Sequence, residues 1–358
     1  MAFKKIKVYN YRNLVDGEIN VEADQVFLVG ENGQGKTNFL ESVYLLCYGS
    51  SFRTRKDKEI VKIGKNAMSV LGTNVVDIDN EISVRIEEGK KKIQFNGKRV
   101  SDRKQLLEHF PCIVFNHDDI DFISGPPERR RWFFNQTMSL YNPLFIDVLR
   151  RYAKILDMRN TSIKEGRLEM LDIYDEQAAA VGIELQKRRA EAISLFNKTF
   201  CSLFLLISGL EEEIGISYFP SWKHADSQDA VVSHLRNRRS LDITFKTTTS
   251  GPHRDRIAFF VSGRDFARIA STGQRRLMSL VLRVAQAKFY SEMTGKMPLL
   301  LLDDVLLELD AKKRRKFISL LPEYNQAFFT FLPDEHYDNY KSGDTIIYRV
   351  ENGSFSEV

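Results

Sequence analysis

Residues 30–37 have the types and spacing that suit the binding of a nucleoside triphosphate. They fit the phosphate-loop pattern of Gly, four residues, Gly, Lys and then Ser or Thr. Glycines permit positive φ angles and close approach, so successive backbone N–H groups can point into one concavity at a helix N-terminus, where the helix dipole favours an anion. We expect Lys36 to bridge the β- and γ-phosphates of ATP and the Thr37 hydroxyl to hold Mg²⁺. The predicted nucleotide-binding residues of this loop are Gly30, Glu31, Asn32, Gly33, Gln34, Gly35, Lys36 and Thr37.

The flanking sequence favours a phosphate loop over the alternative, a glycine-rich turn that merely starts a helix. Gln25–Val29 has the length and apolar content of a strand and leads directly into the loop. After the loop, Phe39, Val43 and Cys47 fall on one side of a predicted amphipathic helix. A simple turn also requires no Lys-Thr pair at its end.

Two adjacent acids could complete a magnesium site. The apolar run Leu299–Leu302 has the composition of a strand covered on both faces, and Asp303 and Asp304 follow it. Open α/β sheets bind ligands at the carboxyl ends of their strands. We expect Asp303 to coordinate Mg²⁺ and Asp304 to orient or deprotonate the attacking water. The alternative is that these acids only start a turn or cap a helix.

A second anion site is predicted about 240 residues beyond the first. Ser271, Gly273 and Gln274 precede a helix with regularly spaced apolar residues, so backbone N–H groups at its start could bind phosphate. One triphosphate rarely needs two such sites in one fold, which suggests that the second site of one subunit closes on the nucleotide of another. An ordinary serine N-cap remains the alternative.

The elements that must position these residues form an α/β fold. The runs Glu87–Lys90 and Asn96–Gly97 indicate hairpin turns, and predict an antiparallel β-layer attached to a mostly parallel one. Further strands are expected at Ile6–Tyr11, Glu81–Glu87, Lys92–Asn96 and Cys112–Phe115.

From about Pro127 to Glu213 the apolar spacing becomes helical, and strand and helix signals alternate again afterwards. We therefore expect a discontinuous α/β domain over residues 1–125 and 245–358, interrupted by a helical lobe over residues 126–244.

Composition narrows the class of protein. With 358 residues, 43% hydrophobic and 28% charged, the chain suits about two globular domains and excludes wholesale disorder. A net charge of +5 permits contact with nucleic acid without demanding it. The N-terminal residues lack the apolar core of a signal peptide, and the apolar stretch around Phe200–Ile207 is too short to span a bilayer. Three widely separated cysteines suit a reducing compartment, so we expect a cytoplasmic protein without a membrane partner.

Four motifs occur in the order typical of ABC-type ATPase heads, which are found in transporters and SMC proteins. They are the phosphate loop, the Ser-x-Gly-Gln element, the acids after Leu302 and the following Glu308-Leu309-Asp310. Further motifs resemble one family of that group, the RecF family. These are Tyr11-Arg12-Asn13, Asn38–Glu41, Ser51-Phe52-Arg53, Gly125–Arg131 and Gly251–Asp255. The resemblance covers essentially the whole chain.

The resemblance implies an SMC-like P-loop ATPase head with a mixed sheet and an inserted helical lobe. It further implies an ATP-dependent homodimer with ATP and Mg²⁺ at its interface, weak ATP hydrolysis, and binding to single-stranded, double-stranded and gapped DNA. Cooperation with RecO and RecR in loading RecA during DNA repair and replication is also implied.

Residue roles carried over by the resemblance complete the site. Ser271, Gly273 and Gln274 would contact the nucleotide of the partner copy, and Asp310 would lie at the dimer seam. Arg12 and Asn13 resemble residues that flank the nucleotide base. The chain departs from the family after Phe329, where Thr330–Pro333 lacks the usual threonine-rich stretch.

Other readings remain open from the residues alone. The basic runs Arg129–Arg131 and Lys312–Lys316 could neutralise DNA phosphates or form solvated faces. His253 is expected to have a structural role. Different functional classes that share a phosphate loop are a small-molecule kinase, a transporter ATPase subunit and an SMC-like DNA clamp; a kinase has no use for the Ser271 element or the Gly251 motif.

Overall fold

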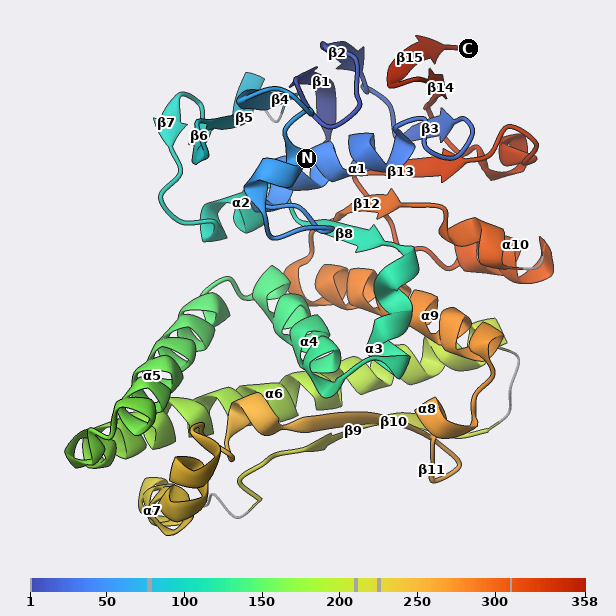
Figure 1. The fold of residues 1–358 in the computed structure, drawn as a ribbon. Helices are drawn as coiled ribbons and strands as arrows, with labels where there is room; N and C mark the ends of the chain where they lie inside the picture. The colour runs from blue at the N-terminus through green and yellow to red at the C-terminus, as the bar shows by residue number, and fades with distance from the viewer. Residues whose placement is uncertain (1, 76–78, 209–211, 224–226, 310) are drawn as a thin grey trace. The chain divides into compact units, whose positions relative to one another are not determined.

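The computed structural model describes residues 2–75, 79–208, 212–223, 227–309 and 311–358, and these form two compact units (Figure 1). The first unit combines the chain up to Asp119 with Leu282–Val358, and the second is Ile120–Val281. The second unit thus extends beyond the lobe expected from the sequence. Its strand β10 (Arg256–Val261) pairs antiparallel with β9 (Ile214–Phe219), so a strand beyond residue 244 is joined to the lobe.

The described part of the first unit contains an antiparallel sheet and a mostly parallel sheet, as the sequence predicted. In spatial order the antiparallel sheet comprises β2 (Gly17–Asn20), β1 (Phe3–Tyr9), β4 (Ala67–Val75), β5 (Asp79–Glu87), β6 (Lys90–Phe95) and β7 (Lys98–Arg99). The second sheet comprises β15 (Ser354–Glu357), β14 (Thr345–Glu351), β3 (Gln25–Val29), β13 (Gln326–Phe331), β12 (Leu299–Leu302) and β8 (Cys112–Phe115), in which β15 alone among the described strands runs antiparallel to its neighbour.

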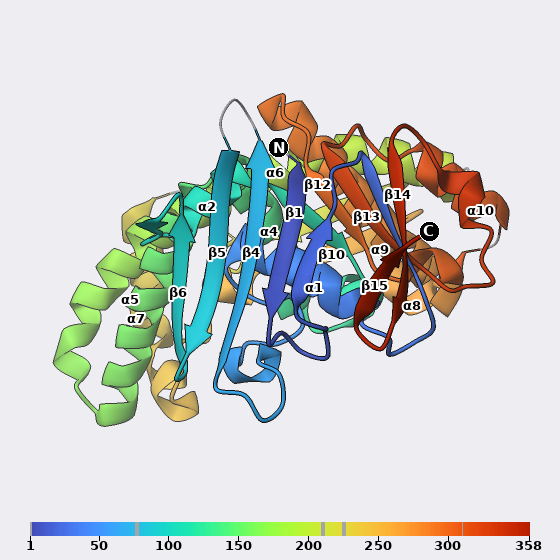
Figure 2. The ribbon, with the colours of Figure 1, turned by 90° about the horizontal axis from the view of Figure 1, so that it is seen from above.

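Helix α1 (Lys36–Tyr48) packs between the two sheets of the first unit (Figures 1 and 2). Its core neighbours include Leu28 from one sheet and Val84 from the other. The sequence predicted a one-sided amphipathic helix, but α1 is buried on nearly every face because apolar strands cover it on both sides. Glu41 is buried with it and requires a charged partner.

The second unit is built mainly from helices around their own apolar core. Pro127 starts α4 at a position where its missing N–H costs nothing. The helices of this unit are α3 (Asp121–Ser124), α4 (Pro127–Tyr141), α5 (Phe145–Glu165), α6 (Leu171–Ser208), α7 (Gln228–Phe245) and α8 (Phe266–Ile269), and β11 (Arg264–Asp265) extends its small sheet. The remaining helices are α2 (Lys104–His109), α9 (Thr272–Thr294) and α10 (Ala311–Ser319).

Short 3₁₀ turns connect several of these elements. They lie at Asp57–Ile60, His117–Ile120, Leu168–Met170, Pro252–Arg254, Val305–Glu308 and Tyr337–Tyr340.

By length and composition alone, the segment Leu168–Ser208 that contains α6 could cross a membrane, which the sequence analysis did not anticipate. However, Ala179 and Leu185 on α6 belong to the core of the second unit, and Gln186 and Arg189 are buried in polar contacts. In this fold α6 therefore serves as a core helix.

Candidate nucleotide-binding site

The phosphate loop lies where the sequence predicted it, between the carboxyl end of β3 and the start of α1. Gly35 has a φ of 117°, and a Cβ there would lie 2.9 Å from Leu14 Cδ2, so only glycine suits this position. Together with Arg53 and Asp304, the loop lines a pocket of about 220 Å³. The pocket is therefore open to an anion at the N-terminus of α1.

Lys36 is buried at the mouth of this loop. Its Nζ donates hydrogen bonds to the carbonyl oxygens of Gly30 (2.6 Å) and Glu31 (3.2 Å). A buried ammonium group held by neutral carbonyls gains a stronger, charge-assisted partner when a phosphate oxygen arrives. Lys36 is thus placed to bind the terminal phosphates of a nucleotide.

Thr37 and Asp303 meet across the site, as expected. The Thr37 hydroxyl donates to Asp303 Oδ1 at 2.8 Å. The pKa of the Asp303 carboxyl is raised to about 6, mainly because burial disfavours its charged form and further because Asp304 lies beside it. The hydrogen bond from Thr37 and the positive charges of Arg53 and Lys36 oppose this rise.

The pair Thr37 and Asp303 fits Mg²⁺ by its chemistry. Mg²⁺ prefers oxygen ligands, takes few of them from the protein, and completes its octahedron with water and phosphate oxygens. A divalent cation would also stabilise the buried Asp303 carboxylate. Among the described residues there is no cluster of three or more His, Cys, Asp or Glu that could hold a metal without a substrate.

Asp304 is held by Thr330, a residue that the sequence analysis did not assign to the site. Asp304 has a left-handed φ of 52°, which is uncommon for a residue other than glycine. The Asp304 N–H donates to Thr330 Oγ1 (2.7 Å), and the same hydroxyl donates to Asp304 Oδ1 (2.7 Å). Thr330 is the penultimate residue of β13, which pairs with β12, so the order of strands in the sheet is the signal that identifies it.

Arg12 contacts α1 through a bidentate ion pair. Its Nε and Nη2 each donate to a Glu41 carboxylate oxygen at 2.8 Å, and the Ser51 hydroxyl donates to the same carboxylate at 2.5 Å. The hydrogen bonds to Glu41 are the first cause of the raised pKa of Arg12. Arg12 therefore compensates the buried Glu41 charge, which the sequence analysis did not foresee; contact with the nucleotide base stays a prediction.

Asn13 supports the loop directly. Its Nδ2 donates to the Gly33 carbonyl (3.1 Å), and its Oδ1 accepts from Asn38 Nδ2 (2.7 Å). Arg53 Nη1 in turn donates to Asn38 Oδ1 (2.6 Å), which brings a second cation to the wall of the phosphate pocket. The sequence motif Ser51-Phe52-Arg53 resembles a RecF motif, but the sequence alone predicts no role for Arg53.

The Ser271 element belongs to the second unit, whereas the phosphate loop belongs to the first. Ser271 and Gln274 form a reciprocal capping box at the start of α9: Gln274 N–H donates to Ser271 Oγ (3.2 Å), and Ser271 N–H donates to Gln274 Oε1 (2.8 Å). The ordinary N-cap is thus present, and the residues from Ser271 to Gln274 are exposed.

Packing against the described residues does not explain why position 273 is a glycine. A Cβ at Gly273 would meet nothing within 4 Å, and its φ is not in the left-handed region. Asp310, predicted at the dimer seam, lies outside the described residues.

The Gly251–Asp255 motif has a structural role in the second unit. The fully buried Asp255 carboxylate accepts hydrogen bonds from Gln186 (2.6 Å), Arg189 (2.9 Å) and Tyr218 (2.5 Å). His253 lies between the Tyr152 hydroxyl (3.0 Å) and the Thr248 carbonyl (2.9 Å), and burial lowers its pKa to about 4. A histidine that is neutral at physiological pH suits this packing role.

The two basic runs differ in their contacts. Arg131 donates to the Asp255 carbonyl (2.7 Å) and Arg130 to the Ile123 carbonyl (2.7 Å), so both serve the second unit, whereas Arg129 packs over the Trp132 ring. On α10, Lys312, Arg315 and Lys316 are exposed. The described structure therefore leaves α10 more accessible to an anionic partner than Arg130 and Arg131.

The fold and this site define an SMC-like ATPase head. The sequence matches the RecF/RecN/SMC N terminal domain family over residues 2–353, and the chain belongs to that family. An Smc head domain bound to the C-terminal winged-helix domain of ScpA shares the fold, with a TM-score of 0.58 at 16% identity over 99% of this chain and 96% of that chain.

Within that family the chain belongs to RecF. It is 43% identical to the DNA replication and repair protein RecF of Treponema pallidum, over 97% of this chain and 99% of that protein. The RecF protein of Clostridium perfringens is 32% identical over 99% of both chains. A solved structure described as the recombination mediator protein RecF with ATP in the RecFOR pathway has a TM-score of 0.90 and 27% identity, covering 99% of this chain and 97% of that chain.

Proposed function

We propose that this protein is an ATP-dependent DNA-binding protein of recombinational repair and replication, which dimerises on ATP. The RecF relatives and the ATP complexes of similar structure support this proposal. So does the phosphate pocket, in which Lys36, Thr37 and Asp303 come together. In this proposal the ATP-bound dimer binds single-stranded, double-stranded and gapped DNA, and helps RecO and RecR to load RecA.

The main support for the proposed dimer is the exposure of the Ser271 element. Ser271 Oγ accepts the Gln274 N–H in the capping box, which leaves the hydroxyl proton able to donate to a phosphate oxygen. Gly273 has no side chain, and no other described residue fills the space next to its Cα. Bare N–H groups at a helix N-terminus suit close approach by a phosphate. We infer that the γ-phosphate held by another copy of the chain makes this approach.

We further propose that hydrolysis is slow and acts as a switch. When bound, Mg²⁺ would neutralise charge developing on the transferred phosphoryl group. Thr37 and Asp303 would hold the ion, Lys36 would bind phosphate oxygens, and Asp304 would orient the attacking water. Because ATP can shift dimerisation only by its differential affinity for the two states, hydrolysis that weakens the bridging contact returns the protein to monomers.

Light scattering of the full chain with Mg²⁺ and ATP tests the proposal. Lys36→Ala should abolish both ATP binding and dimerisation, whereas Ser271→Arg should bind ATP as a monomer. Ser227, whose side chain accepts from the Ala230 N–H, caps α7 in the same way, so Ser227→Arg is a matched control that should still dimerise. Dimerisation of Ser271→Arg equal to that of this control would refute the shared site.

A further inference from the structure

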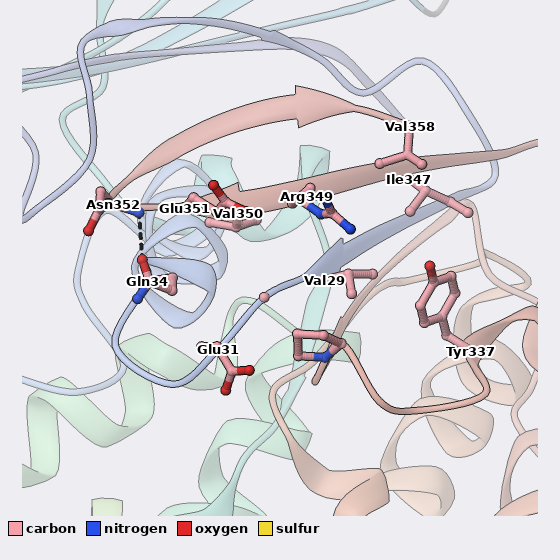
Figure 3. Close-up of a pocket in the computed structure, with 12 residues that line it drawn as sticks. Val29, Glu31, Gln34, Tyr337, Ile347, Arg349, Val350, Glu351, Asn352 and Val358 are labelled. Atoms are coloured by element: carbon pink, nitrogen blue, oxygen red, sulfur yellow. Dashed lines mark hydrogen bonds between the residues drawn. The ribbon is translucent and has the colours of Figure 1, made fainter.

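The C-terminal hairpin reaches the phosphate loop at its turn. Asn352 and Gly353 join β14 to β15, with φ angles of 49° and 78° that are typical of a two-residue hairpin turn. The Asn352 N–H donates to Gln34 Oε1 at 2.6 Å (Figure 3), and the Gly353 N–H donates to the Gln34 carbonyl at 2.8 Å. Both the side chain and the backbone of Gln34 are therefore fixed by the last hairpin of the chain.

The same turn is also held from its other side. The Val15 N–H donates to the Gly353 carbonyl at 2.9 Å. A Cβ at Gly353 would lie 2.2 Å from the Asn13 carbonyl oxygen and 2.9 Å from Leu14 Cα, which are backbone atoms that cannot move aside cheaply. Because Asn13 itself bonds the Gly33 carbonyl, the turn and residues 13–15 together enclose the loop.

The contact between hairpin and loop is made largely by backbone atoms at the turn. A Cβ at Gly30 would lie 2.3 Å from the Val350 carbonyl oxygen, so β14 also passes close to the start of the loop. A cavity of about 320 Å³ lies beside these contacts and is lined by residues of both the hairpin and the loop. Gln34 and Asn352 lie at one end of the cavity and Tyr337 at the other (Figure 3).

We propose that the Asn352–Gly353 turn is a positioning element for nucleotide binding. A loop with glycines at three of its first six positions has many accessible conformations, and fixing it after the ligand arrives would cost conformational entropy. By holding Gln34 beforehand, the turn keeps the N–H groups of the loop directed into the phosphate pocket, without itself contacting phosphate. This inference rests on the proposed nucleotide binding of the loop.

A matched pair of glycine variants tests this role. Gly97 follows Asn96 in the β6–β7 hairpin with a φ of 73°, and a Cβ there would meet nothing within 4 Å in the described structure. Gly353→Ala and Gly97→Ala therefore impose the same left-handed backbone strain, but only the first collides with the residues beside the phosphate loop. We would measure the affinity of each full-length variant for a fluorescent ATP analogue with Mg²⁺, together with circular dichroism and Tm.

We expect Gly353→Ala to bind the analogue at least about tenfold more weakly, equivalent to about 1.4 kcal/mol, and Gly97→Ala to bind as the unaltered protein does. Should both variants bind equally well while Tm falls, the turn is only structural and the inference is wrong. Failure of the unaltered protein to bind the analogue would instead overturn the proposed function.

A second variant covers the case in which Gly353→Ala does not fold. Gln34→Ala leaves the turn intact and removes the Oε1 acceptor of the Asn352 N–H. Weaker binding of the analogue with an unchanged circular dichroism spectrum supports the positioning role. Unchanged affinity of Gln34→Ala would overturn it.

Discussion

Asp304 and Thr330 show how single hydrogen bonds set the chemistry of the site. The left-handed backbone of Asp304 is strained, and strain of this kind persists only when neighbouring groups determine the conformation. One hydroxyl on the adjacent strand satisfies both the N–H and a carboxylate oxygen of Asp304. Thr330 therefore fixes the Asp304 carboxylate, and we predict that it thereby positions this group for the attacking water.

Removing this hydroxyl should slow hydrolysis more than it weakens ATP binding. In Thr330→Val the Asp304 N–H loses its acceptor, at a cost of about 1–3 kcal/mol in stability. We expect phosphate release to slow by about tenfold, the factor that about 1.4 kcal/mol represents. Thr330→Ser retains the hydroxyl and should restore the rate. Equal phosphate release by the Val and Ser variants would contradict this role.

Asp303 should make stability depend on pH. Because its folded-state pKa of about 6 lies above its ordinary value of 3.8, its contribution to stability is fully present below about pH 4 and is lost as the pH rises through about 6. In nucleotide-free, metal-free protein, Asp303→Asn should therefore be more stable than the unaltered protein by about 3 kcal/mol at pH 7.5. Urea unfolding across pH 4–8 measures this difference, and a gap that does not change with pH would show that the carboxyl is not perturbed.

At the scale of elements, the sequence predicts a strand correctly where the pattern that identifies it lies within one short segment. The strands Gln25–Val29, Cys112–Phe115 and Leu299–Leu302 have the predicted bounds because each is a short apolar run that ends at a turn or charged residue. The sequence predicts no strand at β4, because a glycine inside a strand, here Gly72, weakens the strand pattern. In the structure a Cβ at Gly72 would lie 2.7 Å from both Phe3 and Leu46, so packing against other elements selects glycine inside this strand.

The residues of the candidate site likewise fall into those that local sequence predicts and those that it does not. The loop residues and Asp303 follow from local sequence, since a glycine-rich turn and a strand end are contiguous signals. The pairs Arg12 with Glu41 and Thr330 with Asp304 join residues about 30 positions apart. Such pairs depend on which strands and helices are neighbours, and one sequence without the fold does not determine this.

A buried ion network joins three helices of the second unit. Arg159 on α5 is fully buried and donates to Asp175 on α6 (2.7 Å) and Asp242 on α7 (2.8 Å). Arg159→Ala leaves two carboxylates with reduced compensation, and should destabilise this unit by about 3–5 kcal/mol in urea unfolding. Arg236→Ala, which breaks an exposed contact with Asp172, should change little. Similar unfolding midpoints for the two variants would contradict the structural importance of the network.

Over the whole molecule, the motifs expected to share one nucleotide are divided between the two units. Gly30–Thr37 and Asp303 belong to the first, and the Ser271 element belongs to the second. In the proposed dimer, hydrolysis of the bridging nucleotide would therefore change the assembly state of the protein. For DNA binding, this coupling requires that the ATP-bound dimer present more cationic surface to the phosphate backbone than the monomer does.

DNA affinity should accordingly rise with ATP and fall steeply with salt. Counterions released by each neutralised phosphate of double-stranded DNA contribute a slope of about −0.9 to the dependence of log affinity on log salt. If α10 takes part, replacing its exposed Lys312, Arg315 and Lys316 by alanine should reduce this slope by about 2–3 and leave ATP-dependent dimerisation intact. Anisotropy titrations on gapped, single-stranded and blunt DNA with ATP, ADP and no nucleotide provide the measurement.

Two outcomes would contradict this account of DNA binding. A slope that is the same in the triple variant would exclude α10 from the interface. A flat salt response of the unaltered protein would exclude phosphate neutralisation as the source of its affinity.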